Sequence, residues 1–170
     1  QKYNNLIKRA SDEGHTIGLH TYTHNYSSLY ASTNAYFDDL NKIGSMVEGL
    51  IGERPRYIRF PGGSSNTVSR HYSSGIMTKL SKQVIKKGYQ YYDWNCSSGD
   101  AMGDNIPVST LLKYSSDCLA NNVVLLMHDS ETKITTAEAL PKIIAYWREK
   151  GYTFKGIDDN SYAPHHPVYN

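Results

Sequence analysis

Segments with helical periodicity alternate with short apolar segments along most of this chain. Such alternation is typical of parallel strands joined by crossover helices, because each helix packs back onto the sheet between successive strands. It predicts an α/β fold, either a layered sheet or a barrel. Helices are expected over residues 6–13, 33–50, 77–87, 108–119 and 134–150, and strands over residues 15–19, 57–60, 89–94, 123–127 and 152–154.

Composition and charge indicate a folded domain and argue against nucleic-acid binding and membrane insertion. The chain has 170 residues, of which 39% are apolar and 20% are charged. This suits one folded domain, expected over residues 1–160 and followed by a surface tail over residues 161–170. A formal net charge of +2 predicts no nucleic-acid partner. No apolar run approaches the roughly 20 residues that cross a bilayer, and residues 1–5 do not form a signal peptide, so no membrane contact is expected from this segment.

The cysteine and tyrosine counts add two expectations. Two cysteines, Cys96 and Cys118, are too few for a disulfide framework or a four-cysteine zinc module, and both are expected as small core residues. Tyrosine accounts for 15 residues and phenylalanine for only 3. The tyrosine ring has an apolar face and a polar tip, which suits contact with sugar rings, although compositional drift would also explain the count.

Reactive side chains follow four successive strand-type segments. His20 and His24 follow the first, Arg59 and the glycines after it end the second, residues 93–100 follow the third, and His128 follows the fourth. In α/β folds, functional residues gather where strands reach their carboxyl ends. One cleft built from all four strand ends is therefore expected.

Two imidazoles four residues apart, His20 and His24, suggest a metal site. On one helical turn both rings can face a common point, which suits zinc or another divalent ion. A chance pair is the alternative, and a complete site also needs a third protein ligand, usually a carboxylate or a histidine.

The other candidates also have two interpretations each. His128 is either a core histidine bonded to a backbone carbonyl or a general acid beside a carboxylate. Arg59, between two apolar residues, requires an anionic partner, either in a structural ion pair or as a catalytic carboxylate that it orients. Gly62, in the sequence Pro-Gly-Gly-Ser, lets the backbone approach a ligand, so that its N–H groups can face an oxyanion.

Taken together, four motifs resemble the second to fifth motifs of the polysaccharide deacetylases, the NodB-homology domains of carbohydrate esterase family four. They follow the family's order and approximate spacing between about residues 6 and 155. The resemblance implies a distorted (β/α) barrel and the metal-dependent removal of acetyl groups from sugars. The motifs are His20-Thr-Tyr-Thr-His24, Arg59-Phe-Pro-Gly-Gly63, Asp93-Trp-Asn-Cys-Ser-Ser-Gly-Asp100 and Leu125-Leu-Met-His-Asp129.

The resemblance implies a role for each residue that matches a motif. His20 and His24 would bind the metal, expected to be zinc, with cobalt, nickel or iron as alternatives. Arg59 would hold the catalytic base, and the backbone N–H of Gly62 would stabilise the oxyanion.

In the last two motifs, the resemblance implies that His128 is the general acid and that Asp100 is the carboxylate that tunes it. Leu126 would line the pocket for the acetyl methyl group, and Trp94 is a further candidate for substrate binding. The family often has Trp directly after this Asp, whereas this chain has Ala101, so one wall of the pocket is expected to be more open.

The family's first motif, a strand that ends in Thr-Phe-Asp-Asp-Gly, is absent from residues 1–170. In the family it supplies the catalytic base and the third metal ligand. Asp38 and Asp39 do not replace it, because they lie inside an amphipathic helix and are expected to face solvent. The first strand and helix of the barrel are therefore expected to be missing from this chain and to be supplied by an upstream segment.

The function expected from the resemblance is deacetylation of N-acetylglucosamine units in a polysaccharide. Peptidoglycan fits the Arg-Phe-Pro-Gly-Gly variant best, with chitin oligomers and acetylxylan as alternatives. A different class, a catalytically incompetent carbohydrate-binding or scaffold domain, is the alternative function, because both aspartates of the first motif are absent. The 170 residues alone are expected to be inactive. The substrate implies an extracellular or cell-surface location.

Overall fold

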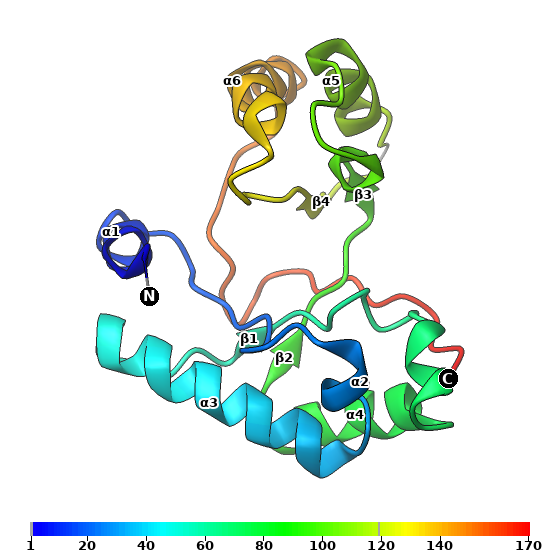
Figure 1. The fold of residues 1–170 in the computed structure, drawn as a ribbon. Coiled ribbons are helices and arrows are strands. Elements are labelled where there is room, and N and C mark those ends of the chain that lie inside the picture. Colours follow the sequence, from blue (N-terminus) through cyan, green and yellow to red (C-terminus); the bar gives the residue numbers. More distant parts are fainter. Residues whose placement is uncertain (1, 119) are drawn as a thin grey trace. The chain divides into compact units, whose positions relative to one another are not determined.

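A computed structural model describes residues 2–118 and 120–170, which divide into two compact units (Figure 1). Unit 1 contains residues 1–93 and 156–170, and unit 2 contains residues 94–155. Within the described residues, each unit holds one two-stranded sheet, and both sheets are parallel. The predicted mixture of helices and parallel strands is confirmed, whereas closure of the strands into a barrel stays a prediction.

Unit 1 places three chain segments side by side in parallel. β1 pairs with β2, with Tyr57 opposite Gln90, and Leu19 forms a single parallel bridge to Ile58. The strand expected over residues 15–19 is thus reduced to one bridge; Gly18, which has no side chain to pack, lies within it. The elements of unit 1 are α1 (Asn4–Asp12), α2 (Tyr26–Leu29), α3 (Thr33–Ile51), β1 (Tyr57–Ile58), η1 (Val68–His71), α4 (Ile76–Lys86) and β2 (Gln90–Tyr91).

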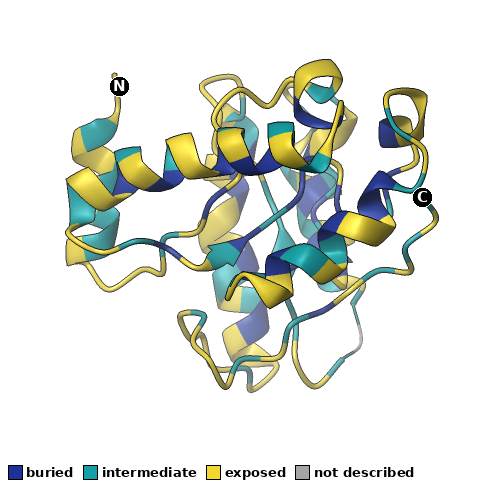
Figure 2. Cartoon of the chain, turned by 90° about the horizontal axis from the view of Figure 1, so that it is seen from below, coloured by how far each residue is buried: buried dark blue, intermediate teal, exposed yellow. Residues whose placement is uncertain are grey.

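Helix α3 shows how the sequence specifies an element of this unit. The Ser32 hydroxyl caps its N-terminus by accepting a hydrogen bond from Ala35 N at 3.0 Å, and Gly52, with φ of 80°, ends it. Figure 2 shows buried and exposed residues alternating along the helices. The buried apolar side chains of α3 join the core of unit 1 with residues of β1, α4 and β2, and they are Tyr36, Phe37, Leu40 and Val47.

Unit 2 has its own core and its own parallel pair of strands. Cys96 lies opposite Leu125, and Ser97 lies opposite Leu126. Trp147 is buried in this core and donates a hydrogen bond from Nε1 to the carbonyl of Ser115 at 3.1 Å. The elements of unit 2 are β3 (Cys96–Ser97), η2 (Asp100–Met102), α5 (Val108–Ser116), β4 (Leu125–Leu126) and α6 (Ile134–Glu149).

Both cysteines lie at the core of unit 2 as expected, Cys96 buried and Cys118 packed against it, but the bond between them was not predicted. Cys96 and Cys118 form a disulfide, with their Cα atoms 5.6 Å apart. Parallel pairing with β4 places Cys96 in the core beside the C-terminal end of α5, and Cys118 lies two residues after the last residue of that helix. Sequence spacing alone does not show this proximity.

Several boundaries in unit 2 also differ from those expected. The helix expected over residues 108–119 ends at Ser116, and Leu119 lies outside the described residues. The strand expected over residues 123–127 is shorter and half-buried. No strand forms over residues 152–154, where Tyr152 instead donates its hydroxyl to the carbonyl of Ala120 at 2.6 Å.

The last ten residues, expected as a surface tail, make specific contacts with unit 1. The His165 ring stacks on Tyr91 with a centroid distance of 3.8 Å, and His166 N donates to the Asp93 carboxylate at 2.8 Å. Asn170 accepts a hydrogen bond from Gly75 N, directly before α4. This segment is therefore held in place at three points.

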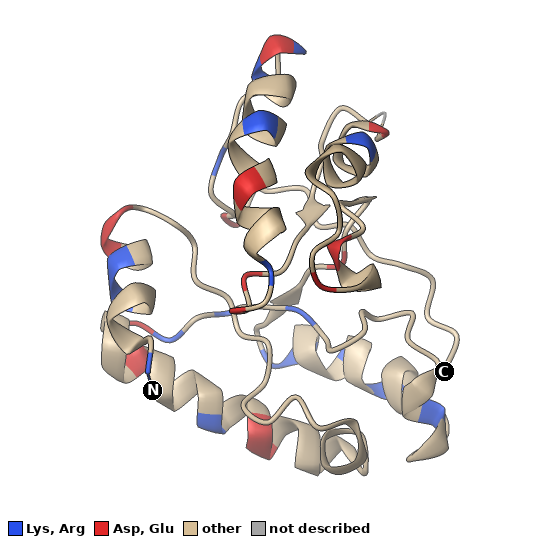
Figure 3. Cartoon of the chain, turned by 45° about the horizontal axis from the view of Figure 1, so that its top comes forward, with Lys and Arg blue, Asp and Glu red and all other residues tan. Residues whose placement is uncertain are grey.

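The surface carries both signs of charge. Figure 3 shows that α3 has acidic and basic residues, whereas α4 has only basic ones. Among the described helices, none combines the length and the apolar character needed to cross a membrane.

Candidate functional site

The histidine pair lies in a loop of unit 1. His20 follows the bridge residue Leu19, and the ring centroids of His20 and His24 are 5.0 Å apart. The expected helical turn was wrong, because Thr21 and His24 have φ of 73° and 52° and belong to no helix. The loop nevertheless brings the two imidazoles together.

One ring nitrogen of His20 has a backbone partner. Nδ1 of His20 lies 2.8 Å from the carbonyl oxygen of Arg59, so this nitrogen carries the proton and Nε2 is the nitrogen that can bind a cation. The two imidazoles therefore fit two positions of a divalent metal site. Within residues 2–118 and 120–170, no group of three His, Cys, Asp or Glu side chains could hold a metal ion. Among the described residues, His20 and His24 are therefore the two candidate metal ligands.

Arg59 lies half-buried directly after β1. Burial lowers the pKa of its guanidinium, and the negative charge of Asp93 opposes this effect. Its Nε donates to the carbonyl of Tyr92 at 3.4 Å, but among the described residues no carboxylate lies within 4.0 Å to form an ion pair with it. A charged group that is half-buried is stabilised when an ion of opposite charge binds to it, so the Arg59 guanidinium is suited to hold an anionic group.

Gly62 lies in a tight loop after β1. It has φ of 77°, and a Cβ at this position would lie 2.6 Å from the Tyr26 hydroxyl, so the conformation and the space both require glycine. The loop is fixed at both ends. The Tyr30 hydroxyl donates to the carbonyl of Pro61 at 2.8 Å, and Ser64 N donates to Asp93 at 2.8 Å. Gly62 itself is exposed, so its backbone can meet a ligand.

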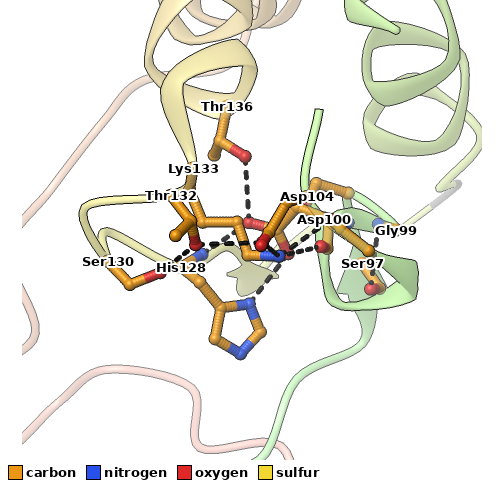
Figure 4. Close-up of polar contacts among 11 residues, drawn as sticks. Ser97, Gly99, Asp100, Asp104, His128, Ser130, Thr132, Lys133 and Thr136 are labelled. Carbon is orange, nitrogen blue, oxygen red and sulfur yellow. Dashed lines mark hydrogen bonds and ion pairs between the residues drawn. The ribbon is translucent and has the colours of Figure 1, made fainter. Parts of the chain in front are cut away.

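Unit 2 places Asp100 against His128 (Figure 4). Asp100 Oδ1 lies 2.8 Å from His128 Nδ1, and Asp100 Oδ2 accepts from His128 N at 2.6 Å. The Asp100 side chain is 2% exposed, whereas the His128 side chain is 42% exposed. Burial by itself raises the pKa of Asp100, but the hydrogen bonds from His128 outweigh it and the pKa lies below its ordinary value. An ionised Asp100 therefore fixes the Nδ1–H tautomer and leaves Nε2 on the exposed side.

Further side chains that the sequence analysis did not single out support this pair. The Thr136 hydroxyl lies 3.3 Å from Asp100 Oδ2, and Lys133 Nζ donates to the carbonyls of Asp100 and Gly103, both at 2.8 Å. Figure 4 shows Lys133 reaching from the start of α6 to the segment that carries Asp100. A cavity of about 610 Å³ lies beside them, lined by residues 127–131, 133, 134, 136, 137 and 140. His128 is therefore one of the residues that line this open cavity.

The two remaining candidates lie in unit 2. Leu126 is half-buried in β4 opposite Ser97, and its carbonyl accepts from Ser98 N at 3.1 Å. Trp94 is half-buried and lies two residues before the first residue of β3. The candidates therefore form two groups: His20, His24, Arg59 and Gly62 in unit 1, and Trp94, Asp100, Leu126 and His128 in unit 2.

Comparisons with known proteins agree on one family. Residues 1–80 match the family model described as polysaccharide deacetylase. The crystal structure of the catalytic domain of a peptidoglycan N-acetylglucosamine deacetylase from Eubacterium rectale is 38% identical, with a TM-score of 0.94 over 99% of this chain and 77% of that one. The polysaccharide deacetylase Bc1974 from Bacillus cereus is 27% identical, with a TM-score of 0.81 over 96% of this chain and 77% of that one.

A curated relative covers nearly the whole chain. A peptidoglycan-N-acetylglucosamine deacetylase from Bacillus cereus is 28% identical over 169 residues, which are 96% of this chain and 58% of the relative. The chain thus spans little more than half the length of the curated relatives that it matches first.

Proposed function

Since the chain belongs to the polysaccharide deacetylase family, we propose that it acts in a metal-dependent hydrolysis that removes acetyl groups from N-acetylglucosamine units of a polysaccharide. Peptidoglycan is the proposed substrate, and a chitin-like oligomer is the alternative. The observation that carries the proposal is the hydrogen-bonded pair of Asp100 and His128, in which a buried carboxylate orients an exposed imidazole beside a cavity.

In the proposed reaction, water adds to the acetyl carbonyl, the bond between carbonyl carbon and nitrogen breaks, and acetate leaves. His128 donates a proton from Nε2 to the departing amine, and Asp100 offsets the positive charge that the imidazole carries beforehand. The N–H of Gly62 donates to the carbonyl oxygen as it becomes negative. Leu126 and Trp94 contact the acetyl group and the sugar.

His20 and His24 are the residues that would hold a divalent metal, proposed to be zinc. When bound, the metal polarises the acetyl carbonyl and lowers the pKa of water. Arg59 would hold the anionic base. Because residues 1–170 contain no Thr-Phe-Asp-Asp-Gly strand, we propose that this base and the third ligand come from another segment and that these residues alone release no acetate.

Metal content tests the histidine assignment. Replacing His20 or His24 with Ala should reduce bound zinc sharply, because a site with a single imidazole holds the ion weakly. His71 is the matched control, since it lies at the exposed end of η1 and its replacement should leave zinc content unchanged. Equal zinc loss in all three variants would contradict the assignment.

A second function, carbohydrate binding without catalysis, is the alternative, because residues 1–170 contain neither aspartate of the first motif. Acetate release and sugar binding distinguish the two functions when an aspartate-bearing segment is supplied. Release of acetate from peptidoglycan or from N-acetylglucosamine oligomers supports the deacetylase, and the faster substrate identifies the polymer. Binding of both polymers without any acetate release would support the binding domain.

An extracellular or cell-surface location is part of the same proposal. Peptidoglycan lies outside the cytoplasm, and the disulfide between Cys96 and Cys118 supports an oxidising compartment.

A further inference from the structure

The carboxylate of Asp39, on helix α3, accepts hydrogen bonds from the loop that connects His20 and His24. Tyr22 N donates to Asp39 Oδ1 at 2.5 Å, while Thr23 N and the Thr23 hydroxyl donate to Asp39 Oδ2 at 3.1 Å and 2.6 Å. We propose that Asp39 is a positioning residue that holds the loop in the conformation in which His20 and His24 converge. The proposal rests on the proposed function in treating these histidines as metal ligands.

The loop needs such support because its backbone conformation is unfavourable. Thr21, a β-branched residue, has φ of 73°, and His24 has φ of 52°. A left-handed conformation costs a residue other than glycine on the order of 1 kcal/mol or more, and β-branching makes it worse. Thr21 is also buried, and its hydroxyl has no hydrogen-bond partner among the described residues. Contacts from outside the loop must therefore stabilise it.

Helix α3 supplies a second contact three residues after the first. Lys42 Nζ lies 4.1 Å from the centroid of the Tyr22 ring, in a cation–π contact. Buried residues of α3, Tyr36 and Leu40 among them, anchor the helix in the core of unit 1. Asp39 thus links the loop to an element that is itself fixed.

The histidines are then held from two directions. Asp39 fixes the backbone of Tyr22 and Thr23 from α3, while the carbonyl of Arg59 fixes the His20 ring from the end of β1. Ligands that are fixed before the metal arrives lose less conformational freedom on binding, so the affinity is higher. The expectation that Asp39 faces solvent was therefore wrong, because it is half-buried against the loop.

Asp38 provides a matched control. It is adjacent on α3, carries the same charge and is exposed. The variants to compare are D39A, D39N and D38A, measured by hydrogen exchange of backbone amides without metal and by titration with Zn²⁺ followed by NMR of the histidine rings.

D39A should expose the Tyr22 and Thr23 amides to faster exchange and weaken Zn²⁺ binding by about 10- to 100-fold, as for other residues that orient metal ligands. D39N should lie between D39A and the wild type, because Asn keeps one acceptor oxygen for Tyr22 N and loses the acceptor for Thr23. D38A should stay within about twofold of the wild-type affinity, because it leaves these hydrogen bonds intact.

Retention of amide protection and Zn²⁺ affinity in D39A would overturn the proposal. Faster exchange throughout unit 1 would also overturn it, because Asp39 would then act on global stability. If the wild-type chain bound no Zn²⁺, the metal site of the proposed function would fail, and ring-to-ring NMR contacts between His20 and His24 would still show whether D39A separates them.

Discussion

His128 combines an exposed imidazole with a buried partner. In a protein completed by an aspartate-bearing segment, replacing His128 with Ala should lower turnover by about two to four orders of magnitude, the range for loss of a general acid. Zinc content should not change, because the proposed ligands belong to a different loop, His20 to His24. Acetate release and metal analysis of the same preparation test this. Loss of zinc in H128A would show instead that His128 is a ligand.

Ionisation of Asp100 makes the stability of the folded chain depend on pH. Because its pKa is depressed in the folded chain, its stabilising contribution is present above its unfolded pKa of about 3.9 and is lost as the pH falls through the folded value. NMR titration of the Asp100 carboxyl carbon should give a midpoint below the ordinary value. In H128A the midpoint should rise, since the hydrogen bond and the electrostatic interaction from the His128 side chain are lost. A midpoint at or above the ordinary value in the wild type would contradict this account.

A single functional residue could be predicted from the sequence only where its type and its position are unusual. His20, His24 and His128 stand out by type and position. Asp39 and Lys133 do not, because an acidic or basic residue on an amphipathic helix usually faces solvent. Their partners lie 16 or more residues away along the chain, so folding was needed to identify them.

At the scale of elements, helices were predicted best. Residues of α3, α4 and α6 repeat apolar side chains at helical spacing, and the structure confirms all three. Strands were predicted less accurately, because pairing depends on a neighbour far along the chain. Residues 152–154 have the composition of a strand but find no strand partner among the described residues.

The disulfide is an element-scale feature, since it joins β3 to the segment after α5. It closes a loop with a sequence separation of 22, and such a crosslink stabilises by about 3 kcal/mol. The double variant C96A/C118A should therefore unfold at lower denaturant concentration. Fluorescence of Trp147, which lies in the core of unit 2, provides the measurement. An unchanged midpoint, or free thiols in the wild-type protein, would contradict the crosslink.

At the scale of the whole molecule, the described residues form two compact units, each with a parallel strand pair, while the single domain expected over residues 1–160 stays a prediction. Chain order alone did not reveal this division, because unit 1 is completed by residues 156–170, which return after unit 2. The candidate residues divide in the same way, four in each unit.

We propose that residues 1–170 supply an acid, an oxyanion donor and two metal ligands, and that an aspartate pair completes the site. Acetate release from peptidoglycan should be measured with a fused segment that carries a Thr-Phe-Asp-Asp-Gly strand and with a matched Thr-Phe-Asn-Asn-Gly control. We expect acetate release with the first segment and none with the control or with residues 1–170 alone. Release should be lost on chelation and recovered with Zn²⁺. Equal release by all three proteins, unaffected by chelator, would contradict it.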